Sequence, residues 1–279
     1  MSGPAKGFVR TINGVELAYT DVGEGPSILL VHGHPFNRTM WQPQVEFLRA
    51  QYRVVAPELR GYGESRLPGG CRETRLETFA SDCVALMDAL HIRTFVLGGL
   101  SMGGQIALEI FRQASHRVVA LLLADTFAGL DPPEVRQSRF TTADRLEQEG
   151  MGVYSREVLT KMITPANVEQ MPAVAAHVME MMTTTSPAGA AAALRGRAQR
   201  IDYEPLLHEI TVPTLVVVGR DDVYTPVSVA RRLHEGISSS ALAIIENAGH
   251  MPNLERAAEF NLLFEQFLSK VFAHAGHAS

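Results

Sequence analysis

The sequence predicts an α/β fold in which a mostly parallel eight-stranded sheet carries helices on both faces and a helical insertion interrupts the order of elements. Three observations support this fold class. Strand-like apolar segments alternate with helix-like segments along most of the 279 residues, a hairpin pattern opens the chain, and the alternation stops between residues 127 and 205 before it resumes. A chain of this length buries the core of one large domain.

The first two strands are predicted to pair antiparallel. Residues 8–12 and 15–19 are strand-like, and the Asn-Gly pair at 13–14 between them is a favoured two-residue hairpin turn. The sheet therefore begins with a hairpin.

Six further strands and five helices follow. The strands are short apolar runs, at 28–31, 53–56, 94–97, 118–123, 214–218 and 241–245. The helices carry apolar residues at helical spacing. They are expected at 41–50, 78–90, 103–114, 228–234 and 255–272.

The segment 127–205 contains no strand candidate and is rich in alanine, methionine and arginine. Prolines divide it, because a proline ends or starts a helix. These are Pro132, Pro133, Pro165, Pro172 and Pro187. We therefore expect several short helices that form a cap at 127–205, between two parts of the core at 1–126 and 206–279.

Charge and composition exclude several classes of protein. The formal net charge of −5 gives no electrostatic footprint for nucleic acid, and no basic block suggests a membrane surface. The longest apolar run, 118–124, is too short to cross a bilayer, and the first seven residues lack the apolar core of a secretory signal. We expect a cytoplasmic protein in which Cys71 and Cys83 are reduced thiols, with Cys83 packed in the core.

A candidate nucleophile lies on a predicted strand-to-helix turn. The motif Gly-Leu-Ser-Met-Gly at 99–103 follows an apolar strand and precedes a helix. Its glycines allow a sharp bend, and the helix start favours negative charge nearby. This pattern predicts that Ser101 is an activated nucleophile.

A serine nucleophile needs a base, and that base needs an orienting acid. His250 follows the last predicted strand within Gly-His-Met-Pro, which points it toward the same edge of the sheet. Asp222 follows the preceding strand and is the expected acid. Asp221 and Asp125 are the alternatives, because both also lie after strands.

Two backbone N–H groups are expected to form an oxyanion hole, which stabilises the negative charge of a tetrahedral intermediate. Met102 follows the serine, and His34 lies in the His-Gly-His-Pro loop after the strand at 28–31. The ring of His34 either orients a neighbour or reaches a substrate, and the former is the simpler interpretation. His32 is expected to be structural.

These motifs resemble those of the α/β-hydrolase superfamily, in which nucleophile, acid and histidine follow in this order. The resemblance rests on the segments 32–35, 41–44, 59–65, 99–104, 212–219 and 249–255. The chain is most similar to 3-oxoadipate enol-lactonases, bacterial esterases and cofactor-free haloperoxidases. Glu58 departs from the aspartate that such relatives carry. The loop 32–35 also resembles epoxide hydrolases, but Ser101 stands where those enzymes have aspartate.

The resemblance implies a serine hydrolase that cleaves a small carboxylic ester or lactone through an acyl-enzyme, without metal or cofactor. One alternative is a perhydrolase or acyltransferase with the same acyl-enzyme. Another is a ligand-binding sensor of hydrolase fold with little turnover.

Substrate choice is expected to lie in the cap. The candidate pocket residues are Phe36, Met151, Met162, Met182 and Met251. The enol-lactone reaction would also require a partner for a substrate carboxylate. Arg195, Arg197 and Arg200 are candidates for that partner, although charged cap residues are more often solvated and methionines more often only pack.

Overall fold

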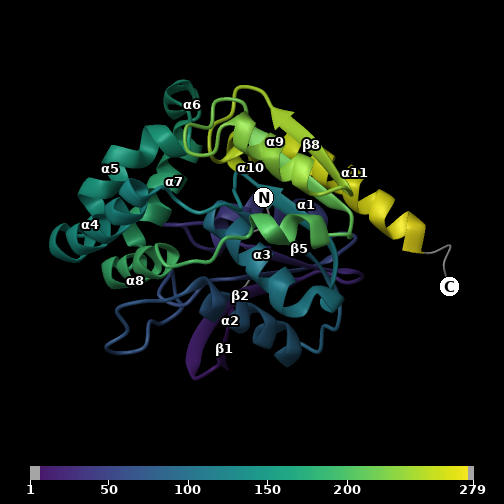
Figure 1. Ribbon diagram of the computed structural model, residues 1–279, viewed down its shortest axis with the longest axis horizontal. Helices are drawn as coiled ribbons and strands as arrows, with labels where there is room; N and C mark the ends of the chain where they lie inside the picture. Colours follow the sequence, from purple (N-terminus) through teal and green to yellow (C-terminus); the bar gives the residue numbers. More distant parts are fainter. Residues whose placement is uncertain (1–6, 276–279) are drawn as a thin grey trace.

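The computed structural model describes residues 7–275, which form one eight-stranded sheet with helices around it (Figure 1). The strand order is β1-β2-β4-β3-β5-β6-β7-β8. The strands are β1 (Gly7–Ile12), β2 (Val15–Val22), β3 (Ser27–Val31), β4 (Arg53–Pro57), β5 (Phe95–Leu100), β6 (Val118–Ala124), β7 (Thr214–Gly219) and β8 (Ser240–Ile245). β2 pairs antiparallel with β1 and β4, and the other pairs are parallel. The predicted fold class is confirmed.

The opening hairpin forms as expected. Asn13 and Gly14 both have positive φ, 48° and 76°, which matches the twist of the two strands. Ile12 then pairs with Val15 across the turn. Residues 1–6, on which the expectation of no secretory signal partly depends, lie outside the described residues.

Helices cover both faces of the sheet. Those outside the insertion are α1 (Gln42–Leu48), α2 (Leu76–Ala89), α3 (Met102–Ala114), α9 (Val227–Gly236), α10 (Pro252–Glu255) and α11 (Ala257–Ala275), with 3-10 helices η1 (Arg38–Trp41), η2 (Ser115–Arg117) and η3 (Glu204–Glu209). Adjacent residues of β5 face opposite sides: Leu97 packs in one core cluster with Ile106 of α3, and Val96 packs in the other with Phe264 of α11. Burial on both faces explains the continuously apolar strands.

The carboxyl ends of four neighbouring strands meet at one edge of the sheet. Val31 of β3 pairs with Gly99 of β5, and Leu100 pairs with Ala124 of β6. Ala124 also pairs with Val217 of β7. Side chains that directly follow these strands are therefore brought close together.

Five α-helices lie between β6 and β7, and Figure 1 shows them gathered on one side of the sheet. They are α4 (Pro133–Glu149), α5 (Met151–Met162), α6 (Pro165–Gln170), α7 (Pro172–Thr184) and α8 (Pro187–Arg197). We call α4–α8 the cap helices. Four of them begin at a proline, because the first helical position needs no N–H donor. The local sequence thus sets where these helices start.

Two further expectations concern thiols and membranes. Cys71 and Cys83 are free, and burial raises the pKa of the Cys83 thiol, which is consistent with packing rather than reactivity. Within residues 7–275, none of the helices combines the length and apolar character needed to span a bilayer.

Candidate active site

Ser101 occupies a strained turn between β5 and α3. Its φ of 58° and ψ of −118° lie in a region that a residue other than glycine seldom adopts. Such a conformation costs about 1–3 kcal/mol and persists only where the surroundings enforce it. Here the Ser101 N–H donates to Ala124 O at 2.9 Å, and Thr126 Oγ1 donates to Ser101 O at 2.7 Å. The end of β6 therefore fixes the turn.

The glycines of the motif are required by close backbone contacts. A Cβ on Gly99 would lie 2.1 Å from Gly103 O, and one on Gly103 would lie 2.2 Å from Val31 O. No flexible side chain is involved, so neither contact could relax easily. The sequence motif is thus a packing requirement of this turn.

His250 and Asp222 form the predicted pair. His250 Nδ1 lies 2.8 Å from Asp222 Oδ2, and both side chains are buried. Asp222 also accepts hydrogen bonds from Tyr224 N at 2.8 Å, from Thr225 N at 3.2 Å and from Thr225 Oγ1. Burial alone would raise the pKa of Asp222, but His250 and the Thr225 hydrogen bonds outweigh it and hold that pKa below its ordinary value. Asp222 is therefore a carboxylate.

The two alternative acids are placed differently. Asp221 is exposed to solvent. Asp125 is buried beside the pair and accepts a hydrogen bond from Gly219 N at 2.9 Å. In the part of the chain that the structure describes, only Asp222 is hydrogen-bonded to the ring of His250.

A cavity of about 1070 Å³ opens onto these groups. Ser101 and His250 line it from the core, while Tyr154 of α5 and Arg197 of α8 line it from the cap helices. Because Nδ1 of His250 is bonded to Asp222, Nε2 is the ring nitrogen left to face the shared cavity. Ser101 and His250 thus face the same cavity.

The loop after β3 packs directly against Ser101. A Cβ on Gly33 would lie 2.9 Å from Leu100 O and 3.2 Å from Ser101 Cβ, so a side chain there would displace the backbone at the end of β5. Met102 is the first residue of α3, so its N–H has no acceptor within the helix. Among residues 7–275, the N–H groups of His34 and Met102 donate no hydrogen bond, which leaves both as free donors.

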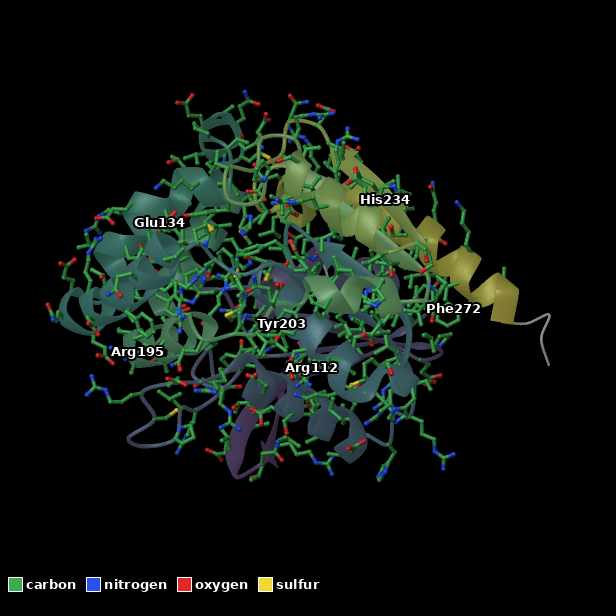
Figure 2. The ribbon with its side chains drawn as sticks, in the orientation of Figure 1. Arg112, Glu134, Arg195, Tyr203, His234 and Phe272 are labelled. Atoms are coloured by element: carbon green, nitrogen blue, oxygen red, sulfur yellow. The ribbon has the colours of Figure 1, made fainter. Side chains whose placement is uncertain are left out.

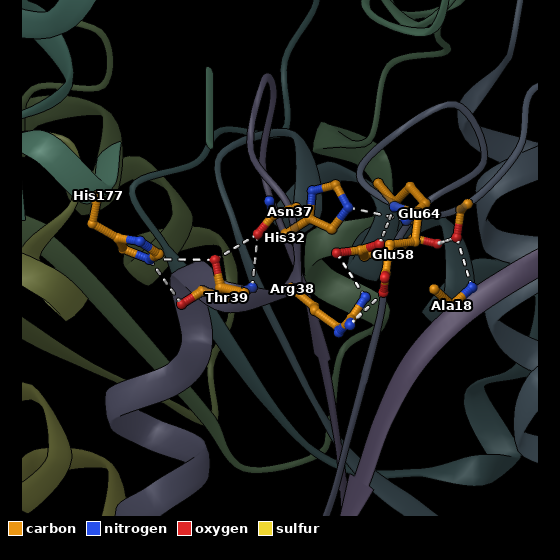
Figure 3. Close-up of polar contacts among 10 residues, drawn as sticks. Ala18, His32, Asn37, Arg38, Thr39, Glu58, Glu64 and His177 are labelled. Atoms are coloured by element: carbon orange, nitrogen blue, oxygen red, sulfur yellow. Dashed lines mark hydrogen bonds and ion pairs between the residues drawn. The ribbon is translucent and has the colours of Figure 1, made fainter. Parts of the chain in front are cut away.

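The ring of His32 is hydrogen-bonded on both sides, and Figure 3 shows its polar contact with the segment that follows β4. Its Nε2 accepts from Leu59 N at 3.0 Å, so Nδ1 carries the proton and donates to Gly33 O at 2.8 Å. Burial lowers the pKa of His32 to about 4, against the opposing Gly33 hydrogen bond and with help from the charge of Arg38. The ring is therefore neutral, and its role is structural as expected.

Glu58 belongs to the same network. It forms an ion pair with Arg38 at 2.8 Å and accepts from Glu64 N at 2.5 Å (Figure 3). Burial raises the pKa of Glu58, although the charge of Arg38 opposes this shift. The carboxylate that departs from the family pattern thus supports the loop and does not enter the cavity.

The ring of His34 also lines the cavity. Its Nδ1 lies 2.8 Å from Tyr62 Oη, while the buried Nε2 has no partner among the described residues. Burial, then the positive charge of Arg197, lowers the pKa of His34, so the ring is neutral.

Four of the five predicted pocket residues do not line this cavity. Met162 does, but Phe36, Met182 and Met251 are buried in the core cluster that contains Phe264, and Met151 packs between α4 and α8. Their positions are corrected to packing, because flexible methionines fill gaps between helices. Sequence reasoning missed other lining residues: Phe127, Asp131, Arg139, Tyr154, Tyr224 and Thr225. Helical periodicity marks a buried face but does not say which cavity that face borders.

The three candidate arginines differ in their partners. Arg195 pairs with Asp144 at 2.7 Å and Glu147 at 2.8 Å, and Figure 2 shows it toward the outer edge of the cap helices. Arg200 pairs with Asp131. Arg197 alone of the three lines the cavity.

Arg197 is a buried cation without a carboxylate partner within residues 7–275. Its Nε donates to Gln105 Oε1 at 2.7 Å, and its side chain is largely buried. Burial lowers the pKa of Arg197, and the charges of Arg139 and Arg200 add to this, while the nearby Asp131 opposes it. Asp131 is already shared by Arg139 and Arg200. An arginine keeps its proton at neutral pH, so this wall of the cavity carries excess positive charge.

One group of side chains has the composition of a metal site. Potential ligand atoms of Asp125, Asp222 and His250 lie within 4.8 Å of one another. However, the Asp222 oxygens and His250 Nδ1 already form hydrogen bonds. Asp125 Oδ1 also accepts a hydrogen bond, from the Gly219 N–H. Only Asp125 Oδ2 remains, so these residues do not fit a metal ion.

Fold and site together define a hydrolase of the α/β class. The model of the alpha/beta hydrolase family matches residues 28–261, and the chain belongs to this family. The chain is 28% identical to 3-oxoadipate enol-lactonase 2 of Acinetobacter baylyi, over 93% of this chain and 96% of the relative. It is 31% identical to a putative non-heme chloroperoxidase of Synechocystis, over 91% and 95%. Among solved structures, a thermophilic esterase from Thermogutta terrifontis is 36% identical with a TM-score of 0.91, over 96% of this chain and 99% of that one.

Proposed function

We propose that this protein is a serine hydrolase that cleaves a small carboxylic ester or lactone. The observation that carries the proposal is the His250–Asp222 hydrogen bond beside Ser101 on its strained turn, with serine and histidine facing one cavity. Ser101 Oγ attacks the carbonyl carbon, and Nε2 of His250 takes the serine proton. Asp222 holds the ring in the required tautomer and stabilises the imidazolium.

The negative charge that develops on the carbonyl oxygen is accepted by the N–H groups of His34 and Met102. His250 then gives its proton to the leaving oxygen, and an acyl-enzyme forms. Water, deprotonated by His250, attacks this ester and restores the serine. Each oxyanion donor contributes about 10²–10³-fold in rate. In this proposal the residues 127–205 act as a cap over the core formed by 1–126 and 206–279.

A fluorophosphonate probe tests the nucleophile. We expect a single label on Ser101, and Ser101→Ala abolishes the label and lowers turnover of short p-nitrophenyl esters about 10⁵-fold or more. Ser138 also lines the cavity, so Ser138→Ala is the matched control and keeps both label and turnover. Unchanged turnover in Ser101→Ala would refute the mechanism.

The positive wall of the cavity favours a substrate that carries a carboxylate, as the enol-lactonase reaction would require. Arg197 is buried and free of carboxylate partners among the described residues, so an anionic substrate would offset the cost of burying its charge. The Thermogutta terrifontis esterase was solved with malate bound, which is itself a dicarboxylate.

Two p-nitrophenyl esters of equal length, one with a terminal carboxylate and one neutral, test this preference. Arg197→Gln should raise KM for the anionic ester about 10- to 100-fold, the loss of one hydrogen-bonded charge pair, and leave the neutral ester within about twofold. Arg195→Gln, two residues away but paired outside the cavity, is the control. An equal effect on both esters would refute the preference for a substrate carboxylate, but it would not contradict the hydrolase mechanism.

A second candidate function is a perhydrolase, in which peroxide replaces water as the acyl acceptor. The relative named as a putative non-heme chloroperoxidase supports this candidate. Product analysis with peroxide present separates the two: a peracid would indicate the perhydrolase, and free acid alone the hydrolase.

A further inference from the structure

A second carboxyl group lies beside the proposed triad without a part in the mechanism. Asp125 directly follows β6, and only 1% of its surface is exposed. Its N–H donates to Val217 O at 2.9 Å, and its Oδ1 accepts from Gly219 N at 2.9 Å. The carboxyl group is therefore held against the end of β7, the strand that leads to Asp222.

The two oxygens of this carboxyl group have different surroundings. Oδ1 has the Gly219 N–H, but no donor in the described part of the chain reaches the buried Oδ2. One side-chain oxygen or nitrogen atom of each of Asp125, Asp222 and His250 lies within 4.8 Å of the others. Asp222 itself accepts hydrogen bonds from His250, Tyr224 and Thr225. Asp222 is thus well stabilised as an anion, and Asp125 is not.

We propose that Asp125 keeps its proton on Oδ2 at neutral pH and acts as a positioning residue, whose carboxylic acid donates a hydrogen bond to the Asp222 carboxylate. The inference rests on the proposed triad. In this assignment Asp222 carries the negative charge and Asp125 carries the proton, because two buried carboxylates this close do not both ionise.

The charges around Asp125 agree with this assignment. Burial raises the pKa of Asp125, and the negative charge of Asp222 raises it further. The charge of Glu255 acts in the same direction, and the Gly219 N–H opposes them. His250 is the basic group of this cluster, and its Nδ1 is directed to Asp222.

A neutral donor suits the proposed chemistry better than a second anion. A hydrogen bond to Asp222 fixes the direction in which this carboxylate faces His250, and it adds no charge to the site. An ionised Asp125 would instead repel Asp222 and stabilise the protonated ring before a substrate had bound.

The substitution Asp125→Asn keeps the shape and the polarity of a protonated acid, because the amide oxygen faces Gly219 N and the amide NH₂ faces Asp222. Asparagine also tolerates the positive φ of 43° at this position. We expect kcat within about threefold of the wild type and an unchanged acid limb of kcat/KM against pH. Asp125→Ala should lower kcat about 10- to 100-fold with little change in KM, since a hydrogen bond to a charged group is lost.

Infrared difference spectra between the wild type and Asp125→Asn at neutral pH give a readout that does not depend on activity. The proposal expects the carbonyl band of a protonated carboxylic acid in the wild type, and it expects this band to be lost in Asp125→Asn. A carboxylate band in its place, or an acid limb that moves by about one pH unit or more in Asp125→Asn, would overturn it. Equal losses of kcat in the Asn and Ala variants, with matching losses of melting temperature, would show a purely structural role. Full activity of Asp222→Asn would instead refute the triad.

Discussion

The two walls of the cavity are built in different ways. On the core wall, Ser101, Asp222 and His250 each follow a strand of the sheet within a short distance in sequence. Backbone and side-chain hydrogen bonds hold each of them. On the wall formed by the cap helices, Tyr154 and Arg197 come from two separate helices, α5 and α8.

This difference reflects two kinds of requirement. Bond-making chemistry needs reacting groups held to within fractions of an ångström, and a rigid sheet edge provides that through short local motifs. Recognition of a substrate needs a shaped and charged surface, which helices from distant parts of the chain supply together.

The largest effect is expected on the core wall. Asp222→Asn should lower kcat about 10⁴-fold, because the amide favours the wrong tautomer of His250 while the geometry is kept. Asp221→Asn, one residue earlier and exposed, should keep wild-type kinetics. Steady-state kinetics on a short p-nitrophenyl ester measure both, and a large loss in Asp221→Asn would exchange the two assignments.

The same glycine-to-alanine change should have opposite results on the two walls. Gly103→Ala places a Cβ 2.2 Å from Val31 O and should cost about 3 kcal/mol or more of unfolding free energy. Gly152 lies in α5, where an added Cβ would make only an ordinary contact, 3.7 Å from Arg156 Nη1, so Gly152→Ala should stabilise the protein by about 0.5–1 kcal/mol. Urea unfolding measures both. Similar values for the two variants would contradict the contrast.

Acid should weaken the attachment of the cap helices. Burial raises the pKa of Asp131, but hydrogen bonds from Arg139 and Arg200 outweigh it and hold that pKa below its ordinary value of 3.8. A depressed carboxyl pKa contributes stability that is present above the ordinary pKa and lost as pH falls through the folded value.

Asp131→Asn tests this pH dependence. The variant should lose about 3 kcal/mol at pH 7, because Arg139 and Arg200 remain buried without their carboxylate. Below about pH 4 the difference from the wild type should shrink, which thermal unfolding across pH would show. A difference that does not vary with pH would assign another role to Asp131.

The smallest effect is expected where the two walls touch. His177 of α7 contacts Thr39 through long hydrogen bonds, 3.3 Å to both Oγ1 and the carbonyl oxygen (Figure 3). His177→Ala should cost less than about 1 kcal/mol in stability and change kcat less than about threefold. A larger loss of kcat with unchanged stability would mean that this contact sets the loop of His34.

The sequence predicts the core wall well and the cap wall poorly. The turn of Ser101, the loop of His34 and the pair of His250 and Asp222 are recognisable because close backbone contacts impose glycines at fixed spacing around them. Prolines also mark most starts of the cap helices. In contrast, the sequence does not distinguish the three candidate arginines, Arg195, Arg197 and Arg200, because they are the same residue type in one segment. Only the tertiary structure shows which of them has a carboxylate partner. The position of Asp125 beside Asp222 could not be predicted either, because both aspartates follow a strand in the sequence.

The hydrogen bond between Arg197 and Gln105 has a consequence for substrate size. Gln105 lies in the first turn of α3, the helix that begins directly after Ser101, so Arg197 and Ser101 are both anchored to one rigid element. The distance between the two ends of a bound anionic ester is then fixed by that helix. A series of half-esters that differ only in chain length should therefore show one sharp optimum of kcat/KM. That optimum would correspond to one spacing between the carboxylate and the ester group.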